Sequence, residues 1–178
     1  TIFPLLAKPV TRGQIITGKF LGCWLAVGIA LAVFYFFFTL ISCSREGRWP
    51  LSSYFQAFWL QWTMLGIVTA MVLFGSVIFT SPAENVTIFF FIVMGILLLG
   101  SHLNDLALQQ AEPIRTVVYA VYFLIPHLEL FDVRDFIIYD QPLIPWVDCF
   151  LATLYALVYV MLFLYATWLV FRRKALTA

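Results

Sequence analysis

Uncharged apolar windows divide the chain into four segments that predict membrane-spanning helices. A spanning helix needs about 20 predominantly apolar residues with no charge near its centre. The spans are predicted at about residues 20–43, 57–80, 85–103 and 149–171. The second starts only at residue 57 because Ser52, Ser53 and Gln56 suit a loop or an interface better than lipid.

A shorter apolar stretch, Thr116–Pro126, lies between the third and fourth predicted spans. Its 11 residues would reach roughly 16 Å as a helix, about half the hydrocarbon thickness. The following stretch, Leu128–Ile138, alternates apolar and charged residues. We expect a re-entrant or interfacial helical pair within segment 104–147, buried in protein at its tip. The predicted fold is therefore an all-α membrane protein with four transmembrane helices and this pair before the last one.

Composition supports lipid as the solvent. The 178 residues are 63% hydrophobic and 19% aromatic, and only 11% are charged, whereas a soluble domain carries roughly 25% charged residues. No run of Lys or Arg is long enough to follow a phosphate backbone, so nucleic acid is excluded as a partner.

The distribution of charge predicts the orientation. Four spans place both ends on one side, which holds six basic residues and one acidic residue, against four basic and eight acidic residues on the other side. Basic residues favour the cytoplasmic side. Residues 1–18 are therefore predicted as a cytoplasmic loop, 19–171 as the transmembrane domain and 172–178 as a basic cytoplasmic tail. An aromatic belt is predicted at the interfaces from Trp49, Trp59, Trp62, Trp146 and Trp168.

The segment Gly13–Lys19 matches the first seven positions of a phosphate-binding P-loop. Its context argues against nucleotide binding. The eighth position is Phe20, which has no hydroxyl for magnesium, and the helix that follows is predicted to enter the membrane instead of packing on a sheet.

The same residues, with those just before them, predict an amphipathic turn and a short helix on the cytoplasmic surface. Thr11 followed by Gln14 three residues on is a capping-box pattern, and Pro9 ends whatever precedes it. Two interpretations stay open. The helix is either a docking element or a simple segment where the chain enters the membrane, with Lys8, Arg12 and Lys19 reaching toward the water.

The side chains that could bind metal do not form a ligand pattern. Four lie on the predicted outer side, at His102, Asp105, His127 and Glu129. The two pairs are far apart in sequence, so polar loop residues are the commoner explanation and no metal site is predicted. Cys23, Cys43 and Cys149 match no zinc or haem spacing, although Cys43 and Cys149 fall near one membrane face, which would allow a disulfide.

Transport chemistry is restricted by the spans themselves. Ion-coupled carriers generally need an ionisable side chain inside the membrane to bind the coupling ion. The predicted spans carry none well inside the membrane. If the protein transports a substrate, the energy is therefore expected to come from elsewhere.

Two segments resemble type 2 ABC-transporter permeases. The run LLAKPVTR at Leu5–Arg12, followed by GKFLG at Gly18–Gly22, is similar to the family's cytoplasmic loop, S-K-P-V-[ST]-R followed by G-K. The run PHLELFDVRD at Pro126–Asp135 resembles the extracellular segment before the last span in a bacterial branch of the family. By this resemblance, the chain corresponds to spans three to six of a six-span permease and is expected to be a piece of a longer protein.

The resemblance implies a permease subunit of an ATP-driven exporter in the bacterial inner (plasma) membrane. ATP would be hydrolysed by a separate ABC-type ATPase subunit, so neither a catalytic residue nor a cofactor is expected on this chain. A second permease copy or paralogue would complete a dimer. Docking to the ATPase is expected through a coupling helix at Lys8, Pro9, Val10, Thr11 and Arg12. An extracytoplasmic gate or re-entrant segment is expected at Pro126, His127, Glu129, Asp132, Arg134 and Asp135.

One alternative of a different class stays open. The acidic outer loop and its two histidines would also suit a membrane-embedded enzyme or an assembly factor.

Overall fold

The computed structural model describes residues 11–46, 51–109, 125–133 and 144–173. Every regular element within these ranges is helical, which confirms the all-α prediction for this part of the chain. The elements in chain order are α1 (Arg12–Glu46), α2 (Leu51–Ile78), α3 (Pro82–Gln109), the 3-10 helix η2 (Leu128–Phe131) and α6 (Trp146–Arg173).

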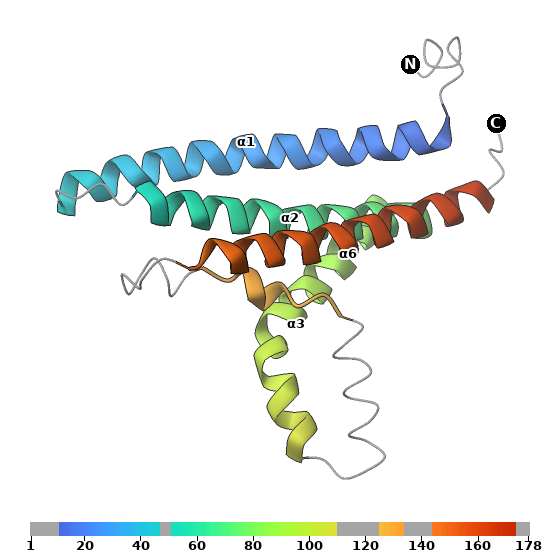
Figure 1. Cartoon of the computed structure of the whole chain (residues 1–178). Coiled ribbons are helices and arrows are strands. Elements are labelled where there is room, and N and C mark those ends of the chain that lie inside the picture. The colour runs from blue at the N-terminus through green and yellow to red at the C-terminus, as the bar shows by residue number, and fades with distance from the viewer. Residues whose placement is uncertain (1–10, 47–50, 110–124, 134–143, 174–178) are drawn as a thin grey trace.

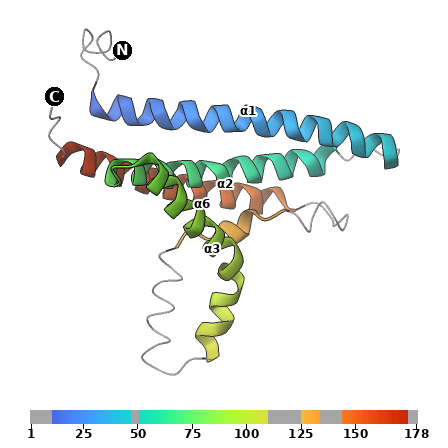
Figure 2. The same cartoon turned by 180° about the vertical axis from the view of Figure 1, so that it is seen from behind.

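Helices α1, α2 and α6 run alongside one another as a bundle (Figures 1 and 2). Helix α2 packs most extensively on α6 and next on α1, and these contacts exceed those between α1 and α6. The chain direction of α1 is opposite to that of α2 and α6, so that α1 begins at the end of the bundle where α6 ends (Figure 1). α2 is therefore the common partner of the other two helices.

Three of the described helices are long and apolar enough to cross a membrane, namely α1, α2 and α6. Helix α1 has 35 residues, or roughly 52 Å at 1.5 Å per residue, and exceeds the hydrocarbon thickness of about 30 Å. Helix α3 covers the predicted third span. Its described apolar part, Pro82–Leu98, is shorter than the apolar helices α1, α2 and α6. It also leaves the bundle, with its far half directed away from the other helices (Figures 1 and 2).

Two helices begin earlier than the sequence predicted. The surface helix expected before residue 20 is not separate from the first span, because α1 continues without a break from Arg12 to Glu46. No proline interrupts that run, so the helical hydrogen bonding has no reason to stop.

The polar start of the second window is also part of α2 and not a loop. Gln56 is only 1% exposed, and its Nε2 donates a hydrogen bond to the Ile144 carbonyl at 2.9 Å. The side chain that suggested an interface is therefore buried against the chain just before α6.

A reciprocal pair of tryptophans joins α1 to α2. The indoles of Trp24 and Trp62 stack with centroids 4.6 Å apart and planes at 14°. Trp24 Nε1 donates to the Trp62 carbonyl at 3.0 Å, and Trp62 Nε1 donates to the Trp24 carbonyl at 3.2 Å. A carbonyl oxygen has two lone pairs, so each can accept an indole proton as well as its helical hydrogen bond. We call this arrangement the tryptophan lock.

Glycines on the opposing helix make room for each indole. A Cβ added at Gly28 would overlap the Trp62 indole, and one added at Gly66 would lie 3.0 Å from Trp24 Nε1. Each glycine follows the tryptophan of its own helix by four residues, which places both on one helical face. The two antiparallel helices thus use the same Trp-x-x-x-Gly pattern toward each other.

Two of the tryptophans predicted for the belt make contacts between helices. Trp62 belongs to the lock, and Trp59 Nε1 donates to Thr153 Oγ1 on α6 at 2.9 Å, so both act between helices. Trp146, at the start of α6, is 58% exposed. Trp49 lies outside the described residues. The cysteines Cys23, Cys43 and Cys149 are all free, so Cys43 and Cys149 are not joined by a disulfide.

Close packing also defines the elbow between α2 and α3. A Cβ at Gly75 would overlap side-chain atoms of Phe89 and Asn85. Asn85 is buried, and its Nδ2 donates to the Val72 carbonyl at 3.1 Å. α3 is therefore held against the end of α2 at its first turns, before it diverges from the bundle.

Candidate functional site

The described part of the predicted docking segment begins at Thr11, and Lys8, Pro9 and Val10 lie outside the described residues. The predicted capping box is present. The Thr11 N–H donates to Gln14 Oε1 at 2.9 Å, and the Gln14 N–H donates to Thr11 Oγ1 at 3.4 Å. These two bonds use backbone donors that the start of a helix leaves without intrahelical partners. The start of α1 is thereby set at Arg12.

Arg12 reaches across to the last turn of α6. Its Nη1 donates to the Phe171 carbonyl at 2.9 Å and to the Arg172 carbonyl at 3.0 Å. Its guanidinium carbon lies 5.6 Å from the centroid of the Phe171 ring. We call these contacts the arginine clamp. The sequence predicted Arg12 as part of the segment that docks on the ATPase, and the structure shows it bound to two carbonyls 159 and 160 residues away.

The electrostatics of the helix ends explain this geometry. The last carbonyls of a helix have no intrahelical partner and carry partial negative charge, which a cation stabilises. The first turn of a helix carries partial positive charge, so Arg12 at the start of α1 is unfavourable for its own helix. The carbonyl end of α6 offsets that cost, because hydrogen bonds from a charged donor are stronger than neutral ones.

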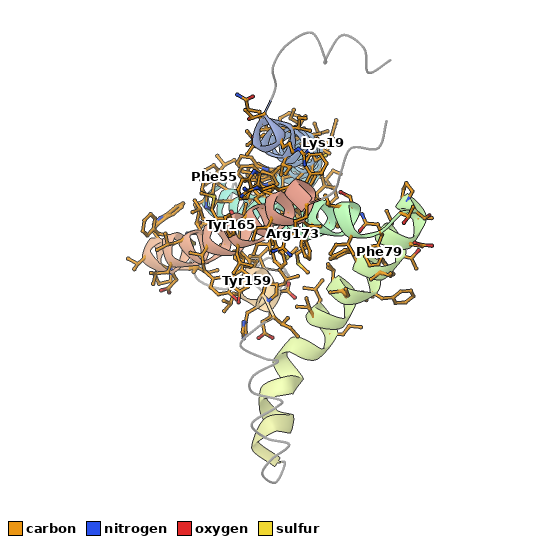
Figure 3. The ribbon with its side chains drawn as sticks, turned by 90° about the vertical axis from the view of Figure 1, so that its right-hand side faces the viewer. Lys19, Phe55, Phe79, Tyr159, Tyr165 and Arg173 are labelled. Atoms are coloured by element: carbon orange, nitrogen blue, oxygen red, sulfur yellow. The ribbon has the colours of Figure 1, made fainter. Side chains whose placement is uncertain are left out.

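Further contacts close the same end of the bundle. A Cβ at Gly13 would lie 4.0 Å from Trp168 Cδ1, in ordinary van der Waals contact. The Arg172 guanidinium lies 5.5 Å from the Trp168 ring centroid. Figure 3 looks onto this end, where Lys19 on α1 lies above Arg173 at the end of α6. The start of α1 and the end of α6 are therefore in direct contact.

The predicted outer segment is described in part, and Arg134 and Asp135 lie outside the described residues. Its apolar side chains are the buried ones. Leu128 is 0% and Phe131 1% exposed, and η2 contacts both α3 and α2. The sequence predicted a role for the charged residues of this segment, whereas the segment is attached to the bundle by its apolar side chains.

Polar contacts add to that attachment. The His127 backbone N–H donates to Tyr155 Oη on α6 at 2.9 Å, and His127 Nδ1 lies 3.1 Å from the same oxygen. Pro126 beside it is buried. Glu129 places Oε2 in the interior, without a hydrogen-bond partner among the described residues. Asp132 donates its backbone N–H to the Glu129 carbonyl at 3.0 Å, which closes the 3-10 turn.

The metal-site candidates are not brought together by the part of the chain that the structure describes. Within it, no group of three or more His, Cys, Asp or Glu side chains could hold an ion. The side chains of His102 and Asp105 lie outside the described residues.

A cavity of about 360 Å³ lies between α1, α2 and α6, beside the tryptophan lock. Its walls are almost wholly apolar. The hydroxyls of Thr17, Thr63 and Thr153 are already bonded to carbonyls of their own helices. This cavity therefore offers an apolar surface but no line of polar groups along which a hydrophilic solute could move.

Comparison with known proteins identifies the family. Residues 1–176 match the ABC-2 family transporter protein family, in agreement with the resemblance to type 2 ABC permeases. No protein of curated function and no solved structure matches the chain. The family match covers nearly the whole sequence and favours the transporter prediction over the membrane enzyme. The match identifies the chain as a membrane component, and the family implies an ABC ATPase partner. The chain therefore belongs to the ABC-2 family of transporter proteins.

Proposed function

We propose that this chain is the permease subunit of an ATP-driven exporter and that a separate ABC-type ATPase acts on the cytoplasmic end of its bundle. The match to the ABC-2 family over residues 1–176 carries the proposal. The arginine clamp supports it, because the segment expected to meet the ATPase leads directly into a residue bonded to a second long helix.

Chain direction supports four spans in place of the three that length and composition alone identify. α2 and α6 run in the same direction (Figure 1). The chain must therefore return across the membrane between Ile78 and Trp146. Helix α3 supplies the apolar stretch Pro82–Leu98 for this crossing, and its roughly 25 Å falls only slightly short of the hydrocarbon core.

The charge distribution supports a cytoplasmic location for the start of α1 and the end of α6. Arg12, Arg172 and Arg173 then lie on the side that basic residues favour. The resemblance of Pro126–Asp135 to a bacterial branch of the family supports the bacterial inner membrane as the location. The segment 104–147 would lie outside, with part of it dipping into the membrane. Burial of η2 against α2 and α3 fits a segment that packs on the bundle without crossing.

A dimer would place the translocation pathway between two permease halves. The cavity beside the tryptophan lock is apolar, and Gln56, the most buried long polar side chain of α2, is bonded to the Ile144 carbonyl. A polar route is thus better placed along a surface shared with a second copy or a paralogue than inside this bundle.

The proposal is tested with the full-length permease and an ABC-type ATPase encoded beside it. We expect the two to purify together from membranes and the permease to raise ATP hydrolysis several-fold. Replacing Lys8 with glutamate should reduce both, since it reverses a charge within the segment proposed to dock. ATP hydrolysis in proteoliposomes and the amount of ATPase retained on the tagged permease are the two measurements.

Lys19→Glu is the matched control. It makes the same charge reversal on an exposed residue of α1, two helical turns beyond the clamp. Equal losses for both variants would assign the effect to net charge. A well-inserted wild-type permease that neither retains the ATPase nor changes its hydrolysis rate would contradict the proposed function.

A further inference from the structure

We propose that Arg12 is a positioning residue that makes α1 and α6 move together, so that a displacement of the segment before α1 is passed to the end of α6. This inference rests on the proposed function and deepens it. It assigns Arg12 to coupling within the permease, in contrast to a direct contact with the ATPase.

The placement of the arginine is the first support. A cation in the first turn of a helix opposes the helix dipole, so local helix stability does not account for Arg12 at the start of α1. Its Nη1 instead bridges the Phe171 and Arg172 carbonyls at 2.9 and 3.0 Å. The capping box at Thr11 and Gln14 fixes the backbone from which the side chain extends.

The second support is how the helices are otherwise connected. The tryptophan lock holds α1 to α2 with two hydrogen bonds and a stacked indole pair. Contacts between α1 and α6 are fewer, and the apolar cavity lies between these helices farther along the bundle. The arginine clamp fastens them at the end beyond that cavity. Because α2 also packs extensively on α6, motion of α1 would then carry α2 and α6 as one body, and the clamp adds the direct link between α1 and α6 at this end.

Lysine should replace the arginine only in part. An ammonium group keeps the charge near the carbonyl end of α6 and can donate to two acceptors, but it lacks the planar guanidinium that lies over the Phe171 ring. Glutamine removes the charge and keeps hydrogen-bonding capacity. The wild type, Arg12→Lys and Arg12→Gln should therefore form a series in which the contact between α1 and α6 becomes progressively weaker.

The first experiment measures how closely the start of α1 is held to the end of α6, in the absence of the ATPase. In a full-length permease whose native cysteines are replaced by serine, Gly13→Cys and Trp168→Cys are cross-linked with a short bifunctional thiol reagent. We expect the cross-linking rate to fall roughly tenfold with Arg12→Gln, as for loss of a charge-assisted hydrogen bond, and less with Arg12→Lys. Arg173→Gln is the matched control, since it removes one exposed positive charge from the same end of α6.

The second experiment measures coupling in proteoliposomes that contain the ATPase. Arg12→Gln should retain the ATPase on the permease but lose most of the stimulation of ATP hydrolysis and of transport. Cross-linking positions 13 and 168 in that variant should restore stimulation, because the covalent bridge replaces the clamp. Restoration distinguishes this role from a contact with the ATPase, which a bridge inside the permease could not replace.

The outcomes separate the two proposals. Equal cross-linking in Arg12→Gln and Arg173→Gln would overturn the clamp. Slower cross-linking in Arg12→Gln together with wild-type stimulation of ATP hydrolysis would overturn the role of the clamp in coupling. Loss of ATPase retention in Arg12→Gln, with no rescue by the bridge, would return Arg12 to the docking surface and also overturn this inference. Failure of the wild-type permease to bind the ATPase would refute the proposed function. The cross-linking result would still test the arginine clamp between α1 and α6.

Discussion

Replacing Gly28 with valine is expected to separate α1 from α2 and to lower the stability of the bundle by at least about 2 kcal/mol. A Cβ at this position already overlaps the Trp62 indole, and overpacking of a close contact typically costs about 1–3 kcal/mol. The indole cannot move aside without breaking its bond to the Trp24 carbonyl, and an intramolecular hydrogen bond contributes about 1 kcal/mol.

Near-ultraviolet circular dichroism and thermal unfolding in detergent measure this effect. The stacked pair of Trp24 and Trp62 should give a tryptophan signal that Gly28→Val removes, together with a lower unfolding temperature. Gly22→Val is the matched control on the same helix, since a Cβ at Gly22 meets nothing within 4 Å.

The double variant Gly28→Val, Trp62→Ala provides a stricter test. Valine can occupy the space that the indole leaves, so the two substitutions should cost less together than the sum of their separate effects. Strict additivity, or a Gly28→Val protein with the wild-type signal and unfolding temperature, would show that the lock does not hold α1 to α2.

A reporter that is active only outside the cytoplasm is expected to be silent when fused after Ala178 and active when fused after Glu112. The effect is all or none, because the two positions are predicted on opposite sides of the membrane. The charge split across the spans predicts that the C-terminal end lies inside, and α3 would carry the chain outward after the elbow at Gly75 and Asn85.

Two more fusions divide this prediction into its parts. A fusion after Glu46, the end of α1, should be active, and one after Ser81 should be silent. Reversal of all four results would overturn the orientation. Loss of activity after Glu112 alone would show that α3 does not cross, and the four-span arrangement would then fail while the orientation stood.

The identity and approximate positions of the long helices were predictable from the sequence because lipid imposes a simple rule. A backbone in hydrocarbon must satisfy its own hydrogen bonds, so a long uncharged apolar run becomes a helix whatever its neighbours are. This rule found α1, α2 and α6 and placed α3. The rule failed at the helix ends, where the contacts of polar residues determine where a helix begins. Gln56 looked like an interfacial residue, yet it lies in α2 and donates to the Ile144 carbonyl.

The capping box was readable from the sequence for a related reason. Its partners Thr11 and Gln14 are three residues apart, so local spacing specifies the contact. Pro126 to Asp135 were predicted as an outer segment from their resemblance to the family. The sequence did not indicate that Leu128 and Phe131 would be the buried attachment of this segment.

Contacts between distant parts of the chain were decided by tertiary structure. Nothing in the spacing of Arg12 indicates two carbonyls at the end of α6, because backbone acceptors are the same at every residue and become available only where a helix ends nearby. The tryptophan lock is similar. Trp24 and Gly28 repeat the spacing of Trp62 and Gly66, but only antiparallel docking of α1 on α2 sets each indole on the opposite glycine. Hydrophobic length determines which segments enter the membrane, whereas the fit of particular side chains to particular backbones determines how those helices are joined.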